Sequence, residues 1–276
     1  MKQMTLREVQ LVSLDVMQEF HNFCVKNNIR YSLSGGSLLG AIRHNGFIPW
    51  DDDMDVQMPR NDFDKFITQY TSATGDFKLY CRELPQQVKQ LGFPYARLCD
   101  MKRTFVDTAN IPWNREKTGI WIDILPCDGM PSDEVEAKKH LRVNNILQEF
   151  AYWYALKFVP WSQVRAATSL KKKMKFILKK IFSYFNCDNF FNLYCKYRKK
   201  YDYDQSDYFF ATCHYNMKEW QPKKYMENFI LHKFEDREFY IMTGYDSNLR
   251  SLYGDYMKEP PASNRAHHSF NINYWR

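Results

Sequence analysis

Three aspartates occur in patterns that could hold divalent metal ions, and the first two stand close together. Asp53 and Asp55 lie two residues apart in residues 53–58, which alternate polar and apolar side chains. Alternate residues of a strand share one face, so these two carboxylates could together bind one or two hard cations. Their mutual repulsion requires compensation, which bound metal would supply. An acidic, solvent-facing edge strand explains this pair equally well.

The third aspartate makes the metal interpretation stronger. Asp123 lies within residues 121–125, a short strand-like segment that is otherwise apolar. Burying a carboxylate there is costly unless it is paired or bound to metal. A hydrogen bond to a neighbouring loop is the alternative. We predict that Asp123 completes the metal site, and that Asp51 and Asp52, which precede the strand, shape the site without binding its metals.

A glycine turn could bind phosphate near these acids. Gly35-Gly36-Ser37 follows a predicted strand at residues 29–34 and precedes a predicted helix at residues 38–44. Glycine allows the backbone to approach an anion, and a helix N-terminus offers free N–H groups. Gly-Gly turns are common, so this signal alone is weak.

The rest of the chain predicts the elements that must position these residues. A capping box at Thr5–Glu8 starts a helix, Asn61 is expected to cap another, and residues 132–200 have a helical pattern. Strands are predicted near residues 77–81, 95–99 and 104–107, a hairpin at 229–241 turning at Asp236-Arg237, and a helix at 246–253. We predict an α+β fold with a mixed sheet: a catalytic lobe at 1–130, a helical section at 131–205, and a segment at 206–276 that packs back on the lobe.

Composition limits the protein class. The chain has 276 residues, 45% of them apolar and 17% aromatic, with a net charge of +7. Its seven cysteines form no CxxC pair, which is typical of reduced thiols in a cytoplasmic protein. We see no signal peptide and no apolar run long enough to span a bilayer. We therefore expect a cytoplasmic protein, soluble or peripheral on the inner face of the cell membrane.

Several motifs resemble one known family. The stretch from Gly36 through Arg43-His44 to Asp55, with Pro49-Trp50-Asp51 at its centre, resembles the LicD family of phosphocholine and polyol-phosphate transferases, which are distantly related to fukutin and have the nucleotidyltransferase fold. Further similar segments lie at residues 58–60, 122–126 and 253–257, and at Pro260-Pro261 and His267-His268. Residues 130–215 match no motif.

The resemblance implies a reaction. Asp53 and Asp55 would hold Mg²⁺ or Mn²⁺ on the pyrophosphate of a CDP-linked donor, and Asp123 would complete the site and accept the proton of the attacking hydroxyl. The expected reaction moves phosphocholine from CDP-choline to a lipid-linked glycan precursor of the cell surface and releases CMP. Alternatives are CDP-glycerol, CDP-ribitol or CDP-ethanolamine as donor, transfer of NMP itself, or a non-enzymatic protein that binds membranes or polyanions. Nucleic acid is not an expected partner.

Other residues within the matched motifs could contact the donor. Trp50 could stack on its base or sugar or could fill the core, and adjacent His267 and His268 point apart in extended chain, so donor contact is expected rather than joint metal binding. The remaining predicted donor contacts are Gly36, Ser37, Arg43, His44 and Arg60.

A basic helix is predicted within residues 171–185. An apolar stripe formed by Leu170, Met174, Ile177, Ile181 and Phe185 runs beside six lysines. This pattern fits a helix lying on anionic lipid, and it fits equally an ordinary amphipathic helix with a solvated lysine face.

Overall fold

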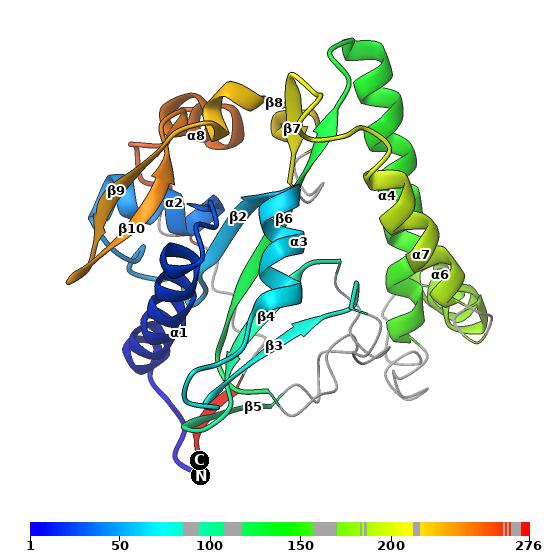
Figure 1. Cartoon of the computed structure of the whole chain (residues 1–276). Helices are drawn as coiled ribbons and strands as arrows, with labels where there is room; N and C mark the ends of the chain where they lie inside the picture. The colour runs from blue at the N-terminus through cyan, green and yellow to red at the C-terminus, as the bar shows by residue number, and fades with distance from the viewer. Residues whose placement is uncertain are drawn as a thin grey trace.

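The computed structural model describes the chain except for residues 85–93, 108–117, 157–169, 183, 185–186, 212–215, 262, 264 and 266–271. It is a mixed α/β structure in which a curled sheet is flanked by helices (Figure 1). This confirms the predicted α+β class.

The first helix, α1 (Leu6–Lys26), begins with the predicted capping box. The Thr5 hydroxyl accepts a hydrogen bond from the Glu8 backbone, and the Glu8 carboxylate accepts one from the Thr5 backbone N–H. The apolar side of the helix, including Val16, Met17 and Phe20, is fully buried. Its packing against β4 and β6 covers one part of the sheet.

The central strands run in the order β1 (Ser32–Leu33), β2 (Asp55–Pro59), β6 (Trp121–Met130), β4 (Ala96–Asp100) and β3 (Phe77–Cys81). Strands β2 and β6 are parallel, and the other neighbouring pairs are antiparallel. The far end of β6 pairs with β7 (Tyr208–Phe210), which pairs with β8 (Gln221–Pro222). The long β6 strand therefore connects the acidic motifs to the last third of the chain.

Two smaller sheets complete the strands of the described residues. Strands β9 (Phe229–Phe234) and β10 (Arg237–Met242) form a hairpin, and β5 (Thr104–Asp107) pairs with β11 (Ile272–Trp275). The hairpin turns at Glu235-Asp236, one residue earlier than predicted, because Phe234 pairs with Arg237. Both chain ends lie close to the β5–β11 pair (Figure 1).

The helices lie around the sheet. The helices α2 (Gly35–His44), α3 (Arg60–Gln69) and α8 (Tyr245–Tyr253) are short, and α4 (Glu134–Leu156), α6 (Leu170–Phe182) and α7 (Cys187–Arg198) make up the helical section. Single 3₁₀ turns occupy Asn216–Glu219 and Lys223–Met226. Helices α4 and α7 pack along one another beside the sheet (Figure 1). Among the described helices, none is long and apolar enough to cross a bilayer.

One hydrophobic core extends from the N-terminal helix to the C-terminal segment. Met54, Val56 and Met58 are each 0% exposed within it, while Phe234 and Leu249 join it from the last third of the chain. The strand phase that buries these residues turns the side chains of positions 53, 55 and 57 to the opposite side, as predicted.

Several predicted boundaries are wrong for local reasons. Helix α2 begins at Gly35 and so includes the Gly-Gly-Ser segment, because the Leu38 N–H donates to the Ser34 carbonyl oxygen at 3.0 Å and closes the first helical turn. Strand β2 begins at Asp55 rather than Asp53, because Asp53 precedes the ladder to β6. The N-cap of α3 is Pro59 and not the predicted Asn61. The fixed φ of proline suits the start of a helix.

A buried ion-pair network joins β6 to α3 and α7. The carboxylate of Asp128 accepts hydrogen bonds from Arg60 (2.6 and 2.8 Å) and from Arg198, and both guanidinium groups are almost completely buried. Arg198 also donates to the carbonyl oxygen of Pro126 at 3.1 Å. The network anchors the helical section to the sheet, because an unpaired charge at this depth would be strongly destabilising.

Candidate active site

A cavity of about 470 Å³ opens where β2, β6 and the N-terminus of α2 meet α8. Its wall contains five carboxylates and four aromatic rings, and no lysine, arginine or histidine among the described residues that line it. The acids are Asp51, Asp53, Asp55, Asp123 and Glu219. The three aspartates predicted from the sequence therefore converge on one cavity.

Strand pairing brings two of these acids together. Asp55 on β2 and Asp123 on β6 are register partners across the parallel pair. The Asp123 N–H donates to the Met54 carbonyl oxygen at 2.9 Å, and the Asp55 N–H donates to the Ser37 hydroxyl at 2.8 Å. Backbone bonds thus fix the positions from which both carboxylates enter the cavity.

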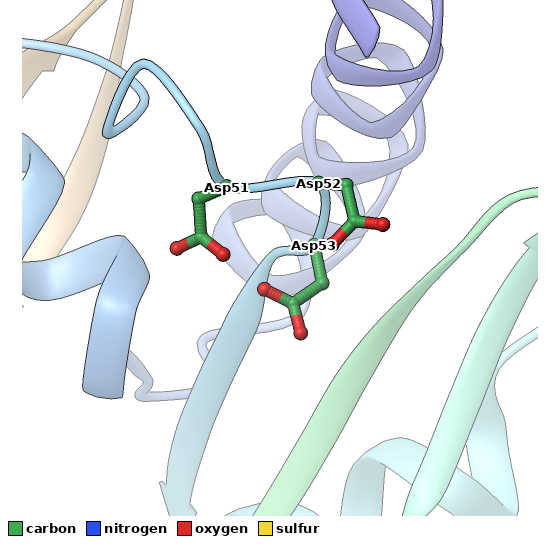
Figure 2. A group of neighbouring side chains, drawn as sticks. All are labelled: Asp51, Asp52 and Asp53. Carbon is green, nitrogen blue, oxygen red and sulfur yellow. The ribbon is translucent and has the colours of Figure 1, made fainter. Parts of the chain in front are cut away.

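The acidic loop before β2 adds further oxygen ligands. Asp51, Asp52 and Asp53 each offer one carboxylate oxygen, and these three oxygens lie within 4.8 Å of one another. Figure 2 shows the three side chains on the loop that leads into β2. We expected Asp51 and Asp52 only to shape the site, but Asp51 also lines the cavity. The loop can therefore contribute a ligand besides Asp53.

Crowding perturbs the acid–base properties of this end of the cavity. Desolvation, followed by the charges of Asp53, Asp123 and Asp51, holds the pKa of Asp55 well above its ordinary value. Desolvation likewise raises the pKa of Asp51. A bound cation would offset this repulsion, because it stabilises the ionised carboxylates.

An arginine that sequence reasoning missed pairs with the third acid. Arg97 on β4 is the register partner of Asp123, and its Nε lies 2.6 Å from the Asp123 carboxylate. Its guanidinium also lies 4.3 Å from the centre of the Trp121 ring. The sequence carried a partial signal, since Arg97 lies among apolar residues in the predicted strand at residues 95–99. The ion pair holds the Asp123 carboxylate in one orientation.

The Gly35-Gly36-Ser37 segment forms the start of α2 and contacts the acidic residues Asp51 and Asp55. A Cβ at Gly36 would lie 2.6 Å from Oδ2 of Asp51, so any larger residue would displace this carboxylate from the start of α2. Helix N-termini favour negative charge, which suits a carboxylate there. Ser37 is buried, and its hydroxyl accepts from the Asp55 backbone. Ser34, Gly35 and Gly36 line the cavity, whereas Ser37 does not.

Three basic residues predicted to clamp phosphate do not line the cavity. Arg60 is buried in ion pairs with Asp128 and Glu83, so the structure gives it a stabilising role instead of a donor contact. Arg43 donates to the Tyr256 carbonyl oxygen at 2.8 Å and to His44 Nε2 at 2.9 Å. These bonds hold the C-terminal segment against α2. His267 and His268 lie outside the described residues.

Aromatic rings form much of the remaining wall. Trp50 lines the cavity, and the Arg265 guanidinium lies 4.2 Å from its ring centre, so this ring already receives a cation on one face. Tyr95, Phe209 and Tyr253 also line the cavity. Neither Phe209 nor Glu219 was predicted, because long-range folding alone brings residues of β7 and the following 3₁₀ turn to the acidic strands.

The donor set fits a hard divalent cation. Asp51, Asp53, Asp55 and Asp123 offer carboxylate oxygens around a single cavity, and such ligands suit Mg²⁺ or Mn²⁺. Burial and the neighbouring carboxylates raise the pKa of Asp55, and a bound cation would offset both effects. The cavity could therefore bind metal-complexed phosphates.

Comparison with known proteins gives consistent matches. Residues 28–142 match the nucleotidyltransferase domain shared by LicD, FKTN and FKRP. The chain is 33% identical over 282 residues to the lipopolysaccharide cholinephosphotransferase LicD of Haemophilus influenzae, covering 99% of each chain. It is also 27% identical over 186 residues to an uncharacterised protein of Rickettsia prowazekii, covering 59% of this chain and 64% of that one.

Proposed function

The chain belongs to the LicD family, and from that membership we propose that it transfers phosphocholine from CDP-choline to a hydroxyl of lipopolysaccharide or a related surface glycan, releasing CMP. The observation that carries this proposal is the likeness to the Haemophilus influenzae cholinephosphotransferase, which extends over 99% of both chains. The matched domain, residues 28–142, contains all four aspartates of the cavity.

The aspartates would hold the metal ions. Asp53 and Asp55 are the proposed principal ligands, and Asp51 and Asp123 line the same cavity. Bound Mg²⁺ or Mn²⁺ would neutralise charge on the donor pyrophosphate. Because no basic residue lines the described wall, this acidic cavity needs such a cation before it can accept a diphosphate.

Arg97 bears on the part that Asp123 plays. A carboxylate 2.6 Å from a buried guanidinium is held in one orientation, which suits a metal ligand. Asp123 remains the proposed acceptor of the hydroxyl proton, as the family resemblance implies. Asp51 lines the same cavity and is a further candidate metal ligand beside Asp53.

The wall chemistry favours a cationic cargo. Choline carries a quaternary ammonium group, which aromatic faces and carboxylates attract, whereas glycerol and ribitol carry no charge. Glu219, Phe209 and Tyr253 provide such groups in the cavity. This observation supports phosphocholine over polyol phosphates, with phosphoethanolamine as the closest alternative.

We also propose a lipid-linked acceptor at the inner face of the cell membrane. A soluble nucleotide donor and a lipid-linked glycan would meet there. The Haemophilus influenzae relative is named for lipopolysaccharide.

Purified protein tests the proposal directly. We would incubate it with Mg²⁺, a lipopolysaccharide or lipid-linked glycan acceptor, and in turn CDP-choline, CDP-ethanolamine, CDP-glycerol and CDP-ribitol, and then quantify CMP. Acceptor-dependent CMP release, fastest with CDP-choline, is the expected result. Faster release from CDP-glycerol or CDP-ribitol would reassign the cargo, and pyrophosphate release from a nucleoside triphosphate would reassign the reaction to NMP transfer.

A further inference from the structure

We infer that α6 forms a docking surface for an anionic lipid bilayer. This inference does not depend on the proposed reaction, because it concerns a helix outside the cavity. Figure 1 shows α6 at the edge of the molecule, beyond α4 and α7 as seen from the sheet. The occupant we propose is the headgroup region of a membrane with negatively charged lipids.

The apolar stripe of α6 faces outward. Met174 is 60% exposed, Ile177 38%, Leu178 54%, Ile181 47% and Phe182 52%. Their spacing of three and four residues places all five on one side of the helix. An ordinary amphipathic helix buries this stripe in the core, so the structure reverses the expected orientation.

The inward side of α6 confirms this reversal. Lys180 is only 2% exposed, and Phe176 is partly buried, while the helix packs on α4. Tyr184, just beyond the helix, is 55% exposed and extends the apolar surface. A lysine turned inward and isoleucines turned outward indicate that the exposed stripe meets something other than water.

The charge of the helix identifies the partner. The thirteen residues of α6 contain six lysines, of which Lys180 faces inward, and no acidic residue. Helical periodicity puts positions 173 and 175 on the two borders of the apolar stripe. Apolar residues flanked by lysines are the pattern of a helix that lies in the interface plane of an anionic bilayer. A second copy of this chain would bring the same positive charges together, which opposes self-association through this surface.

Vesicle binding tests the surface without any donor or acceptor. We would measure co-sedimentation of the full chain with vesicles of phosphatidylcholine alone and with vesicles that also contain phosphatidylglycerol. Binding should require the anionic lipid and weaken as salt is raised, since screening limits attraction to about 8 Å at physiological ionic strength. Ile177→Glu with Ile181→Glu should lower the bound fraction at least about tenfold, because both side chains would otherwise enter the interface.

The hairpin strand β9 provides a matched control. Ile230 and Leu231 are 44% and 49% exposed, so Ile230→Glu with Leu231→Glu adds the same charge at equally exposed apolar positions. This pair should leave vesicle binding unchanged. If the α6 pair fails to fold by circular dichroism, Lys171→Gln with Lys172→Gln and Lys175→Gln replaces it and should remove the preference for anionic vesicles.

Three results would overturn the inference. The first is an absence of binding to anionic vesicles, and the second is equal binding by wild type and the folded α6 variants. The third is a concentration-dependent dimer in light scattering that the α6 pair abolishes while vesicle binding is lacking, which would assign the surface to a second copy. CMP release from a soluble acceptor should be unaffected by the α6 variants, so a failure here is distinct from failure of the proposed reaction.

Discussion

Asp55 and Asp123 lie directly opposite one another on the parallel strands β2 and β6, although 68 positions separate them in the sequence. On its other side, Asp123 faces Arg97 of β4. Asp123 therefore has a close basic partner in Arg97. Asp55 instead has a raised pKa, because it is buried among other carboxylates. This asymmetry leads to different predictions for the two positions.

Asp55→Asn should abolish transfer and stabilise the metal-free protein. Loss of a proposed ligand should lower activity by at least about 100-fold, while removal of a crowded charge relieves repulsion with Asp53 and Asp123. Thermal denaturation with and without Mg²⁺ provides the measurement. Mg²⁺ should raise the Tm of wild type and leave that of the variant unchanged. Asp236→Asn is the matched control, because that exposed carboxylate lies in the hairpin turn.

The raised pKa of Asp55 also predicts a pH dependence without metal. Its folded-state pKa lies above the unfolded value of 3.8, so the folded protein binds the proton more tightly. Between those two pKa values the folded state holds more protons, and the stability contributed by this group falls as pH rises. The free energy of unfolding of wild type relative to Asp55→Asn should therefore increase as pH is lowered from neutrality. A difference independent of pH would contradict the assigned crowding.

Arg97→Met should impair the site through Asp123. Loss of the 2.6 Å ion pair leaves Asp123 less firmly oriented, and such supporting residues typically contribute about 10- to 100-fold in metal affinity or activity. Metal titration and CMP release should weaken together. Arg97→Lys keeps the charge and should recover part of both. Full activity in Arg97→Met would show that the ion pair with Asp123 does not support the site.

The Asp128 network predicts a purely structural effect. Asp128→Ala leaves Arg60 and Arg198 buried without their shared partner, which should cost about 3–5 kcal/mol of unfolding free energy. The two arginines hold the pKa of Asp128 below its ordinary value, so its contribution is lost only as pH falls through that lowered pKa. Urea denaturation checks the loss. The metal affinity of the folded fraction should not change.

His140 should make the protein sensitive to mild acid. The ring is almost completely buried and stacks on Tyr197, and burial lowers its pKa to about 4. The unfolded chain takes up a proton below 6.5, whereas the folded chain does not until about 4, so stability falls as pH drops across that window. His140→Phe keeps the stacking and should flatten this part of the stability curve. A curve unchanged in the variant would assign the acid sensitivity to other groups.

Local pattern predicted most of the elements that position the site. The alternation of Asp53, Met54 and Asp55 identified the strand phase, since burial of apolar side chains dictates which face the acids take. The capping residues Thr5 and Glu8 likewise located α1, because those bonds form within one turn. Both features depend on neighbours in sequence.

Long-range contacts account for what the sequence did not reveal. Arg60 was assigned to phosphate because its partner Asp128 lies 68 positions away, on a strand longer than predicted. Glu219 and Phe209 reach the cavity only after β7 pairs with β6. The outward orientation of the α6 stripe was equally undetermined, because an amphipathic pattern does not specify which medium the apolar side meets.

The measurement that tests the central claim most directly is mass analysis of the acceptor glycan after reaction with CDP-choline and Mg²⁺. We predict that wild type adds one phosphocholine group per modified hydroxyl with an equal amount of CMP, that a chelator stops the reaction until Mg²⁺ is restored, and that Asp55→Asn adds none. Unmodified glycan in the presence of wild-type protein, or phosphocholine addition that persists with the chelator or with Asp55→Asn, would contradict the proposed metal-dependent phosphocholine transfer.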